Sequence, residues 1–590
     1  MELRSVLAES SLFTGLSAAS LDALAALATP LALSSGERLF SEGDAAEHLY
    51  VVATGRMRVT IEGGFLAGYV GPLEPIGEIG LLSGERRTAT IDAVRDSLLI
   101  QIKRDELMAF LIANPTALVA IVRVLISRLR QNQRQQKLQS ARSARTLAVI
   151  PASAGVDAAA VARALQEKLS VRDTCRLLDA AYVDRELGDG EAHTPINDSA
   201  HNQRVVEWLN RIERDHRYLI YSADADPSPW AARCMRQADR VLVVIDSATP
   251  PASTPMLDAL RRSGILAIVE LVILRKQGEP GGDVLTWKSL SGAKSHYFVR
   301  PGNSTDLESL ARQLTGRAIG LVLGGGGARG FAHLGLLRAL EERGMKIDVA
   351  GGSSMGALIS ALVACGYSSN EMLPLLRETF VTHNYLNDYM FPRIALIKGR
   401  KFLRRLRQIF GDMQIENLLL PWFCVSTNLT RGTAVVHDAG PLEIWLAASM
   451  SVPGIAPPVV WKGELLADGA VVNSLPTDVM QNLARGPIIA SNVSTDGDIR
   501  APGIEGPDPE GLLTWTGPGE PPSLREILFR TATLTSESGV QRRAASADLY
   551  LRMPVTGIGM FEWKRMDEII DRGYQFAKEK LDASADVLLR

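Results

Sequence analysis

A serine flanked by glycines, a short distance after a glycine-rich turn, is the feature of this 590-residue chain most directly tied to chemistry. The serine is Ser354, in the pentapeptide 352–356, and the glycine-rich turn spans residues 324–330. A serine hydroxyl at the centre of Gly-x-Ser-x-Gly can attack a carbonyl carbon, and the backbone N–H groups of a glycine turn can stabilise the oxyanion that forms. The two motifs in this order predict a serine hydrolase.

The glycine turn taken alone also fits a dinucleotide-binding site. Gly325, Gly327 and Gly330 match Gly-x-Gly-x-x-Gly, and Asp348 lies roughly where that fingerprint places an acidic residue. A dinucleotide-binding unit does not, however, require Gly-x-Ser-x-Gly at the next turn. The combination therefore favours the hydrolase interpretation.

Ser354 also needs a proton acceptor. Only His383 and His437 follow it, and neither lies in a recognisable motif. Asp468 ends an apolar segment and is followed by glycine, as expected at the rim of a site, and no histidine follows it. A Ser–Asp–His order with this acid is impossible, so the simplest assignment is a dyad in which Asp468 accepts the serine proton. Burial would raise the pKa of this carboxyl above the ordinary value of about 3.9.

Four short segments must position these residues. Residues 321–323 predict a buried strand before the glycine turn, and apolar spacing over 331–343 predicts a helix after it. Residues 349–351 lead into the serine motif, and residues 357–364 predict a second helix. Strand, sharp turn, nucleophile and helix in this order expose a serine hydroxyl at the edge of a parallel sheet.

These motifs resemble the patatin-like phospholipase family, whose dyad combines the serine of Gly-x-Ser-x-Gly with the aspartate of Asp-Gly-Gly or Asp-Gly-Ala. Further segments resemble the bacterial relatives of neuropathy target esterase: 391–392, 399–400, 410–416, 423–430 and 448–454. The resemblance covers about residues 317–585. It implies a phospholipase or lysophospholipase that cleaves carboxylic esters of lipids and requires no cofactor or metal.

Carried over position by position, the resemblance makes Ser354 the nucleophile and Asp468 the general base. The residues of the implied oxyanion hole are Gly325, Gly326 and Gly327, with Arg329 beside them. The accompanying motif positions are Gly330, Gly352, Gly356, Gly469 and Ala470, the last a common alternative to glycine. Candidates for lining an acyl pocket are Tyr385, Tyr389 and Phe391.

Residues 12–110 alternate short apolar runs with glycine turns, which predicts an antiparallel β-roll or barrel with flanking helices. Segment 77–90 resembles the phosphate-binding cassette of cyclic-nucleotide-binding domains. By that resemblance Glu78 would hold the ribose 2′-hydroxyl and Arg87 the cyclic phosphate, in a site made by Gly77, Glu78, Arg87 and Thr88. A regulatory ligand, cAMP or cGMP, would follow; the alternative is a degenerate module that only docks onto its neighbours.

The whole chain predicts a multidomain protein. Its parts are a cyclic-nucleotide-binding-like β-roll with its following helix at 1–140, a small α/β parallel-sheet domain at 145–315, and an α/β patatin-like catalytic domain at 317–590. The middle domain shows no nucleophile or complete phosphate loop and is expected to couple the other two. The amphipathic helix predicted at 114–140 would mediate a homodimer or dock internally. No helix-turn-helix follows it, which argues against binding to nucleic acid.

The composition and the pattern of charged and apolar residues limit the partners and the cellular location expected for the chain. The net charge is −2 and charged residues make up 22%, so no global attraction to nucleic acid is expected. Four scattered cysteines, no signal peptide and no long apolar run predict a cytoplasmic location. Residues 398–410 predict a basic amphipathic helix that either lies on an anionic lipid surface, at the inner face of a membrane, or faces the core.

Two rival functions fit the same residues. A non-catalytic scaffold would bind a cyclic nucleotide and dock on membranes, and labelling of Ser354 by a fluorophosphonate would argue against it. An acyltransferase would use the same dyad with an alcohol in place of water, and product analysis would identify it.

Overall fold

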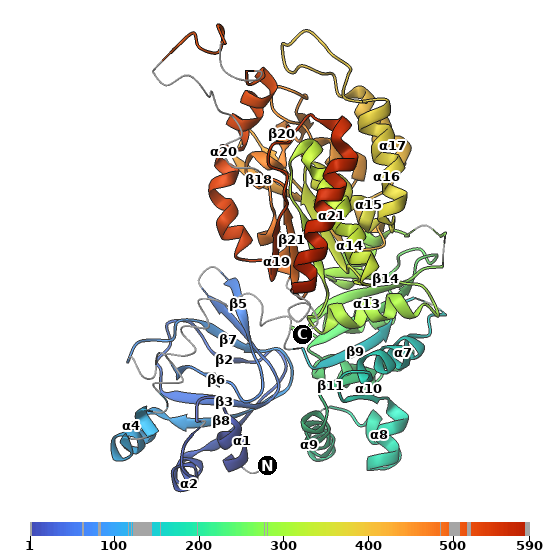
Figure 1. Cartoon of the computed structure of the whole chain (residues 1–590). Helices are drawn as coiled ribbons and strands as arrows, with labels where there is room; N and C mark the ends of the chain where they lie inside the picture. The colour runs from blue at the N-terminus through green and yellow to red at the C-terminus, as the bar shows by residue number, and fades with distance from the viewer. Residues whose placement is uncertain are drawn as a thin grey trace. The chain divides into compact units, whose positions relative to one another are not determined.

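Figure 1 shows the computed structural model, which divides into two compact units, residues 1–315 and 316–590. The structure describes residues 3–13, 15–61, 64–78, 80, 84–115, 117–119, 121, 144–153, 155–196, 199–276, 278–279, 281–483, 485–494, 508–515 and 521–583. Most of the amphipathic helix predicted at 114–140 lies outside these ranges. Within them, no helix is long and apolar enough to cross a bilayer.

The first domain of the N-terminal unit is a β-roll with flanking helices, which confirms the predicted fold. Its elements are α1 (Leu3–Glu9), α2 (Ala18–Leu27), β1 (Thr29–Leu33), β2 (Arg38–Phe40), β3 (His48–Thr54), β4 (Met57–Ile61), β5 (Phe65–Val70), β6 (Pro75–Ile76), β7 (Thr90–Ala93), β8 (Ser97–Lys103) and α4 (Arg104–Ala113). The strands form two four-stranded antiparallel sheets, in the orders β1-β8-β3-β6 and β2-β7-β4-β5. Gly55, at φ 106°, makes the turn between β3 and β4, where a Cβ would lie 2.1 Å from the Ser97 hydroxyl.

The second domain of this unit is a parallel sheet covered by helices on both faces, also as predicted. Its elements are β9 (Thr146–Pro151), α7 (Ala158–Ser170), β10 (Cys175–Leu178), α8 (Ala180–Leu187), η2 (Glu191–His193), α9 (Ser199–Asp215), β11 (Tyr218–Ser222), α10 (Pro229–Gln237), β12 (Arg240–Asp246), α11 (Pro255–Arg262), β13 (Ile268–Leu274), α12 (Val284–Ser291), β14 (Ser295–Val299) and α13 (Ser304–Leu314). The strand order is β10-β11-β9-β12-β13-β14. Alternate residues of β9 enter different cores, Leu147 with α7 and α13 and Ala148 with α9 to α12, because the strand is buried on both faces.

A buried cluster of charges joins the two domains of this unit. Arg95, in the turn between β7 and β8, donates to Glu213 of α9 at 2.8 Å and to Asp239 at 3.0 Å. Arg56 lies 3.6 Å from Asp239, and all four side chains are at most 5% exposed. Deleting one member of a buried ion pair costs about 3–5 kcal/mol, because the remaining charge has no partner. The cluster therefore fixes the β-roll to the parallel-sheet domain.

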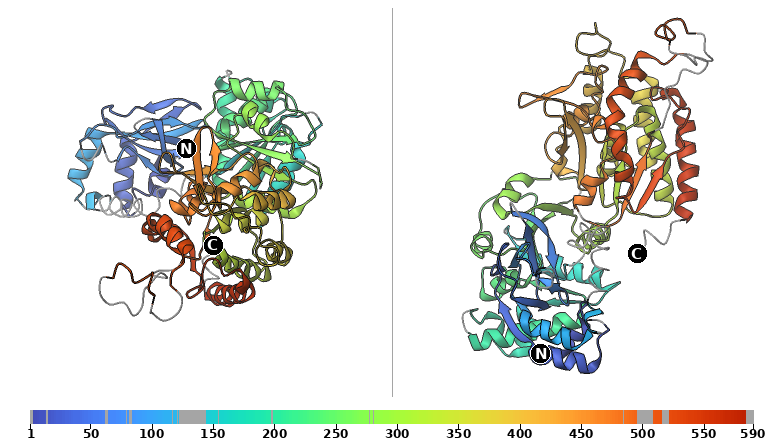
Figure 2. Two further views of the ribbon diagram at one scale, coloured as in Figure 1. Left: turned by 90° about the horizontal axis from the view of Figure 1, so that it is seen from above. Right: turned by 90° about the vertical axis from the view of Figure 1, so that its left-hand side faces the viewer.

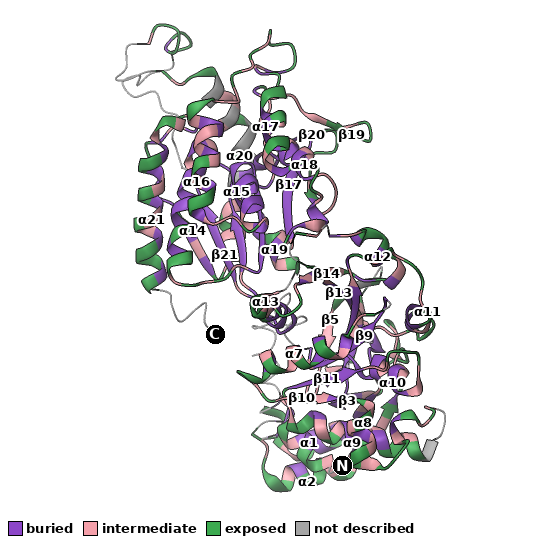
Figure 3. Cartoon of the chain, turned by 90° about the vertical axis from the view of Figure 1, so that its right-hand side faces the viewer, coloured by how far each residue is buried: buried purple, intermediate pink, exposed green. Residues whose placement is uncertain are grey.

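The C-terminal unit is built on a mixed sheet in the order β19-β20-β17-β16-β15-β21-β22, with β18 also paired to β17. Its elements are β15 (Gly320–Leu323), η3 (Gly327–Phe331), α14 (Ala332–Glu342), β16 (Val349–Ser353), α15 (Met355–Ala364), α16 (Ser369–Leu376), η4 (Arg377–Thr382), α17 (Arg400–Phe410), η5 (Ile415–Asn417), β17 (Trp422–Asn428), β18 (Thr433–His437), α18 (Leu442–Ser449), β19 (Val459–Trp461), β20 (Glu464–Asp468), η6 (Gly469–Val471), α19 (Thr477–Leu483), β21 (Ile488–Asn492), α20 (Leu524–Ala544), β22 (Leu549–Arg552), η7 (Trp563–Arg565) and α21 (Met566–Ala583). Strands β17, β16, β15, β21 and β22 are parallel, whereas β18 and β20 run antiparallel to β17. Figure 3 shows the central strands buried beneath helices.

Helices α14 and α21 meet at unusually short range on one face of this sheet. A Cβ at Gly335 would lie 2.3 Å from the carbonyl oxygen of Ile570, and one at Gly573 would lie 2.5 Å from that of Ala332. Small residues at both positions therefore let the two backbones touch. Helix α21, the last of the helices drawn in red in Figure 2, therefore packs directly against α14, which follows the glycine turn.

Candidate active site

Ser354 occupies a strained turn between β16 and α15. Its φ of 53° and ψ of −124° lie where residues with a side chain are rarely found. The neighbouring glycines make the turn sterically feasible: a Cβ at Gly352 would lie 2.6 Å from the Leu323 carbonyl oxygen, and one at Gly356 would lie 2.1 Å from it. The strand–turn–nucleophile–helix order expected from the sequence is present, with the helix beginning at Met355.

Asp468 is hydrogen bonded to Ser354 although 114 positions separate them in the chain. The Ser354 hydroxyl donates to Asp468 Oδ2 at 2.7 Å, and the Ala470 N–H donates to Oδ1 at 2.8 Å. Asp468 ends β20 and pairs with Ser426 of β17, the strand next to β16, so the sheet brings the two residues together.

The electrostatics suit a proton acceptor. Asp468 is 1% exposed, and this burial raises the pKa of the carboxyl to about 7, against the opposing effects of the Ala470 N–H and the Ser354 hydroxyl. A carboxylate with a pKa near neutrality holds a proton far better than a free aspartate does. The arrangement can therefore move a proton from the serine during nucleophilic attack.

Neither histidine that follows Ser354 has a recorded contact with the dyad among the described residues. His437 is buried on β18, lies 2.7 Å from the Ser426 hydroxyl and stacks on Trp445 with ring centroids 4.1 Å apart. Burial lowers its pKa to about 4. His383 is exposed and lies 4.0 Å from Glu378. The geometry therefore offers the serine a carboxylate partner and no imidazole.

Backbone contacts on both sides hold the dyad in place. The Ser449 hydroxyl accepts the Ser354 N–H at 3.0 Å and donates to the Val425 carbonyl at 2.7 Å. The Asp468 N–H donates to the Ser451 carbonyl at 2.8 Å. A Cβ at the motif residue Gly469 would lie 2.1 Å from the Val425 carbonyl oxygen, so glycine is required immediately after the aspartate.

The glycine turn differs in one respect from the expected oxyanion hole. The Gly325 N–H donates to the Ser474 carbonyl at 3.0 Å and is therefore not free for a substrate oxygen. Its contribution is close packing, since a Cβ there would lie 3.1 Å from Ser354 Cβ and 3.2 Å from Ala470 Cβ. Within the described part of the chain, Gly326 and Gly327 have no recorded acceptor for their N–H groups. The candidate donors to the oxyanion are therefore the N–H groups of Gly326 and Gly327.

The residues that follow bind the turn to a distant segment. The Ala328 N–H donates to the Met560 carbonyl at 2.8 Å, and Arg329 Nε donates to the Ile558 carbonyl at 2.6 Å. Arg329 therefore has a structural partner, and its expected place beside the oxyanion stays a prediction. A Cβ at Gly330 would lie 2.3 Å from Met355 Cγ, so this motif glycine admits the start of α15.

His333 holds the glycine turn from below and was not found from the sequence, because a lone histidine in an apolar helix carries no motif. Its Nε2 lies 2.9 Å from the Gly324 carbonyl oxygen and its Nδ1 lies 2.9 Å from the Ser491 hydroxyl. The carbonyl can only accept, so Nε2 carries the proton and Nδ1 accepts from the hydroxyl. Burial lowers the pKa of His333 to about 4, which keeps the ring neutral.

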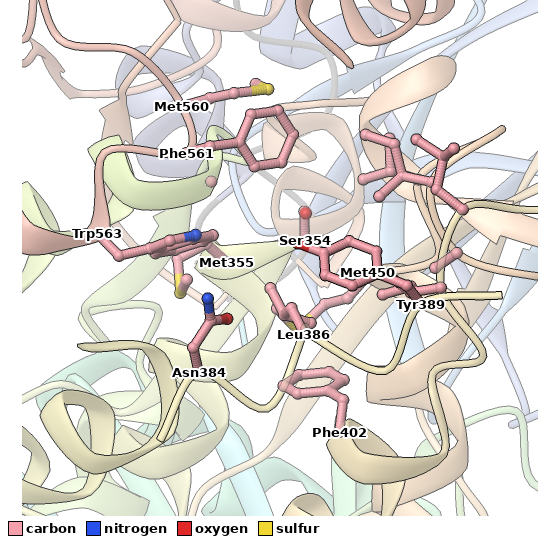
Figure 4. Close-up of a pocket in the computed structure, with 16 residues that line it drawn as sticks. Ser354, Met355, Asn384, Leu386, Tyr389, Phe402, Met450, Met560, Phe561 and Trp563 are labelled. Carbon is pink, nitrogen blue, oxygen red and sulfur yellow. The ribbon is translucent and has the colours of Figure 1, made fainter. Parts of the chain in front are cut away.

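An apolar pocket of about 850 Å³, part of it open to solvent, lies over Ser354 (Figure 4). Its lining comprises Gly327, Ser354, Met355, Asn384, Leu386, Tyr389, Leu396, Ile397, Phe402, Met450, Val452, Ile455, Ala456, Met560, Phe561 and Trp563. Of the three aromatic residues expected to line an acyl pocket, only Tyr389 does so. Phe391 is 79% exposed, and Tyr385 lies beside the Arg405 guanidinium, 5.5 Å from the ring centroid.

In the predicted cyclic-nucleotide site, the arginine is hydrogen bonded to backbone carbonyls of its own domain. Arg87 donates to the Gly77 carbonyl at 3.1 Å and to the His48 carbonyl at 2.7 Å. Its guanidinium lies 4.2 Å from the Phe40 ring centroid, the residue is 5% exposed, and burial lowers its pKa. Glu78 is close enough to act electrostatically on this arginine. Gly77 at φ 82° leaves room for it, since a Cβ there would lie 2.0 Å from Nη1.

The rest of this site is partly outside the described residues, which omit 79 and 81–83. Thr88 is exposed beside the buried Arg87. A cyclic phosphate would need Arg87 to exchange its carbonyl partners for phosphate oxygens. The structure thus places Gly77 and Glu78 close to Arg87, whereas the binding of a cyclic nucleotide by these residues and Thr88 stays a prediction.

The middle domain places an acid where α/β folds often bind phosphate. The turn after β9 leads to α7, and the Asp157 side chain accepts the Ala160 N–H at 2.8 Å at the start of that helix. A carboxylate there occupies one of the free N–H groups of the helix and repels an anion. Across the described ranges, no group of three or more His, Cys, Asp or Glu side chains is placed to hold a metal ion.

Three family models match consecutive parts of the chain. The model described as a cyclic nucleotide-binding domain matches residues 30–114. The Neuropathy Target Esterase family P-loop like domain matches residues 143–316, and the patatin-like phospholipase model matches residues 321–480. The last range contains Ser354 and Asp468.

Curated relatives match almost the whole chain. Patatin-like phospholipase domain-containing protein 6 of Pongo abelii is 30% identical over 93% of this chain and 44% of its own length. Lysophospholipase nte1 of Neosartorya fischeri is 27% identical over 94% of this chain and 42% of its own length. The chain thus spans less than half the length of these relatives.

Among solved structures, the N-terminal domain of a transcriptional regulator from Streptomyces coelicolor A3(2) is 32% identical over 22% of this chain and 92% of its own, with a TM-score of 0.20. The family models and the relatives together confirm the resemblance seen in the sequence. The chain carries a cyclic nucleotide-binding domain, a P-loop like domain of the neuropathy target esterase family and a patatin-like phospholipase domain.

Proposed function

We propose that this chain hydrolyses the carboxylic ester of a lysophospholipid or phospholipid. The observation that carries the proposal is the 2.7 Å hydrogen bond from the Ser354 hydroxyl to the buried Asp468 carboxylate, beneath an apolar pocket. The match to the patatin-like phospholipase model supports the substrate class, and so does the resemblance to relatives named phospholipase and lysophospholipase.

In the proposed reaction, Ser354 Oγ attacks the ester carbonyl carbon while Asp468 Oδ2 takes its proton. The N–H groups of Gly326 and Gly327 stabilise the oxyanion. Collapse of the tetrahedral intermediate breaks the bond to the alcohol, which leaves with the proton from Asp468. Water then attacks the acyl-serine while Asp468 accepts a proton from it. The bond from the acyl carbon to Ser354 Oγ breaks, Asp468 returns the proton to Oγ, and the fatty acid is released.

The pocket favours a long apolar chain on the acyl side. Its wall is formed by Leu386, Phe402, Met450 and other aliphatic and aromatic side chains, with Asn384 among the few polar groups. Figure 4 shows these side chains gathered around Ser354. Burying each methylene of a chain in such a wall contributes about 0.8 kcal/mol. The same wall offers little to a charged head group, which is expected to remain at the open side.

Fatty-acid release from lysophosphatidylcholine tests the proposal. Wild type should release fatty acid and react with a fluorophosphonate, and Ser354→Ala should do neither while unfolding at a similar temperature. His437→Gln is the matched control for the base, and it should retain activity if the acceptor is a carboxylate. Failure of wild type both to hydrolyse the lipid and to take up the probe would contradict the proposal. Transfer of the acyl group to an added alcohol, in preference to water, would identify an acyltransferase.

We also propose that the N-terminal domain binds a cyclic nucleotide as a regulatory ligand. Support comes from the family model over residues 30–114 and from the clustering of Gly77, Glu78 and Arg87. Binding is expected to be weak, because Arg87 must first release two carbonyl oxygens. Calorimetric titration with cAMP and cGMP should show binding by wild type and by Arg86→Ala, an exposed neighbour, but not by Arg87→Ala. Equal binding by all three would place the ligand elsewhere, and no binding by wild type would favour the docking-module interpretation. The homodimer and the cytoplasmic location stay predictions from the sequence.

A further inference from the structure

The segment between η4 and α17 exposes large apolar side chains at its tip. Phe391 is 79% exposed, Ile394 is 68% exposed and Tyr389 is 55% exposed. In Figure 1 this yellow loop projects beyond the end of α17. The two most exposed of these side chains, Phe391 and Ile394, are unfavourable in a soluble protein unless they meet a partner. The loop is therefore a candidate docking element.

Hydrogen bonds order the base of this loop, so the exposed side chains are held on a defined structure. Tyr389 and Ile397 form a β-bridge, and the Met390 N–H donates to the Leu396 carbonyl at 3.0 Å. The Asp388 carboxylate accepts the Gly399 N–H at 3.2 Å and the Lys401 N–H at 3.1 Å. The tip thus stands on a hydrogen-bonded hairpin that joins directly to α17.

Helix α17 adds positive charge beside the tip. Phe402, Leu406 and Phe410 are buried in the core, so its apolar stripe faces the protein, as one of the two sequence interpretations expected. Its outer side and the preceding loop carry exposed cations: Arg393, Lys398, Arg400, Lys401 and Arg404. In the described part of the chain none of the five has a recorded carboxylate partner, whereas the buried Arg405 pairs with Glu378 at 2.6 Å.

The same segment also forms part of the wall of the pocket over Ser354. Leu386, Tyr389, Leu396 and Ile397 belong to the pocket wall. Figure 4 shows Tyr389 and Leu386 beside Ser354. The exposed tip thus belongs to the same segment as residues of the pocket wall, so a surface that meets the tip lies close to the pocket over Ser354.

From this juxtaposition we infer that Phe391 and Ile394, with the five cations around them, dock the catalytic unit onto an anionic lipid bilayer. This inference rests on the proposed function, since it supplies the route by which a membrane lipid reaches Ser354. The apolar side chains enter the interface while the cations contact lipid phosphates, an arrangement typical of peripheral membrane proteins. An anionic bilayer fits both halves of the surface, whereas an acidic protein would leave the apolar tip without a matching partner.

Each cation close to an anionic bilayer strengthens binding about fivefold at physiological salt. Lys398→Gln/Arg404→Gln should therefore weaken binding by about 25-fold, and raised salt should weaken the wild type in the same way. Phe391→Ser/Ile394→Ser should weaken binding by about tenfold or more, with little dependence on salt. The salt dependence of vesicle binding therefore distinguishes the charge substitutions from the apolar substitutions.

Co-flotation with vesicles tests these expectations on the full chain carrying Ser354→Ala, so that no lipid is consumed. Phosphatidylcholine vesicles with and without phosphatidylglycerol are the probes. The control for charge is Lys346→Gln/Lys578→Gln, which removes two exposed cations elsewhere on the same unit, and the control for apolar surface is Val460→Ser, 69% exposed on β19. No binding of the parent chain to either vesicle, or equal losses in the control variants, would overturn the inference.

Hydrolysis of a soluble short-chain ester separates this inference from the proposed function. Active chains carrying the loop or α17 substitutions should keep the wild-type rate on the soluble ester and lose activity only on anionic vesicles. A wild type that floats with vesicles but cleaves neither substrate would overturn the proposed hydrolase and leave the docking surface supported. Preferential capture of an acidic protein, with no loss of vesicle binding in either double variant, would replace the bilayer by that partner.

Discussion

Replacing Asp468 by asparagine is expected to remove turnover and, at the same time, to stabilise the fold above neutral pH. Asparagine keeps the shape of the side chain, and its amide can still hydrogen bond to Ser354 and to the Ala470 N–H. It lacks the negative charge, however, and cannot take up the serine proton. The substitution therefore separates the chemical role of the carboxylate from the free energy needed to bury it.

The size of the effect follows from the pKa of the buried carboxyl. Burial raises the pKa of Asp468 from 3.8 to about 7, and each pKa unit corresponds to about 1.4 kcal/mol. Between these pH values the folded chain keeps a proton that the unfolded chain has released, so the free energy of unfolding falls as pH rises and levels off above about 7. Asparagine avoids this loss. Its gain is at most about 4 kcal/mol above pH 7 and disappears toward pH 4.

Calorimetry of wild type and Asp468→Asn across this pH range measures the gain. The full difference corresponds to a rise in the Tm of the catalytic unit on the order of 10 °C, shrinking toward acid pH. Fatty-acid release should fall by about a hundredfold or more at and above pH 7, where the wild-type carboxylate is ionised, and the difference should shrink toward acid pH. Equal Tm values at all pH values would refute the argument from burial, and near-normal turnover in the variant would refute the dyad.

The value of kcat/KM should fall about tenfold per pH unit below the pKa of Asp468, about 7, because only the ionised carboxylate accepts the serine proton. Initial rates on a soluble ester measure this limb, and a midpoint near 4 would contradict the assignment. His333→Phe should lower kcat about tenfold to a hundredfold with KM changed by no more than about threefold, because the Gly324 carbonyl loses its donor and the oxyanion turn its position. Recovery of kcat in His333→Gln, whose amide can still donate to the carbonyl, would support a positioning role. An equal loss of kcat in both variants, with equal Tm values, would oppose it. Gly356→Ala should lower the free energy of unfolding by about 1–3 kcal/mol or more, since its Cβ would lie 2.1 Å from the Leu323 carbonyl oxygen. Urea unfolding measures this loss, and an unchanged midpoint would show that the turn can relax.

Local motifs were readable because they describe local backbone conformation. Gly-x-Ser-x-Gly after a short apolar strand predicted the turn at Ser354, and the close contacts of Gly352 and Gly356 show why those positions require glycine. Asp-Gly at 468–469 was readable for the same reason. The alternation of apolar residues likewise predicted a β-roll followed by a parallel sheet.

Contacts between distant segments could not be read in this way. The Gly325 N–H was expected to face the substrate, yet it donates to the Ser474 carbonyl, which lies in the segment between η6 and α19. Ser474 is itself placed by its N–H donating to the Ser536 hydroxyl of α20 at 2.8 Å. Arg87 was expected to face a phosphate, yet it donates to two backbone carbonyls. In both cases a carbonyl from another segment accepts the hydrogen bond that was expected to go to a ligand, and the sequence does not show that this carbonyl is nearby.

The sequence by itself thus determined which residues can do chemistry here, Ser354 and Asp468, and the class of fold that carries them. Only the tertiary structure decided that the two meet across 114 positions, that burial brings the pKa of the carboxyl to about 7, and that Phe391 faces outward rather than into the pocket. The physical reason is that residue type and spacing fix local conformation, whereas burial, pKa and hydrogen-bond partners depend on which distant segments pack together.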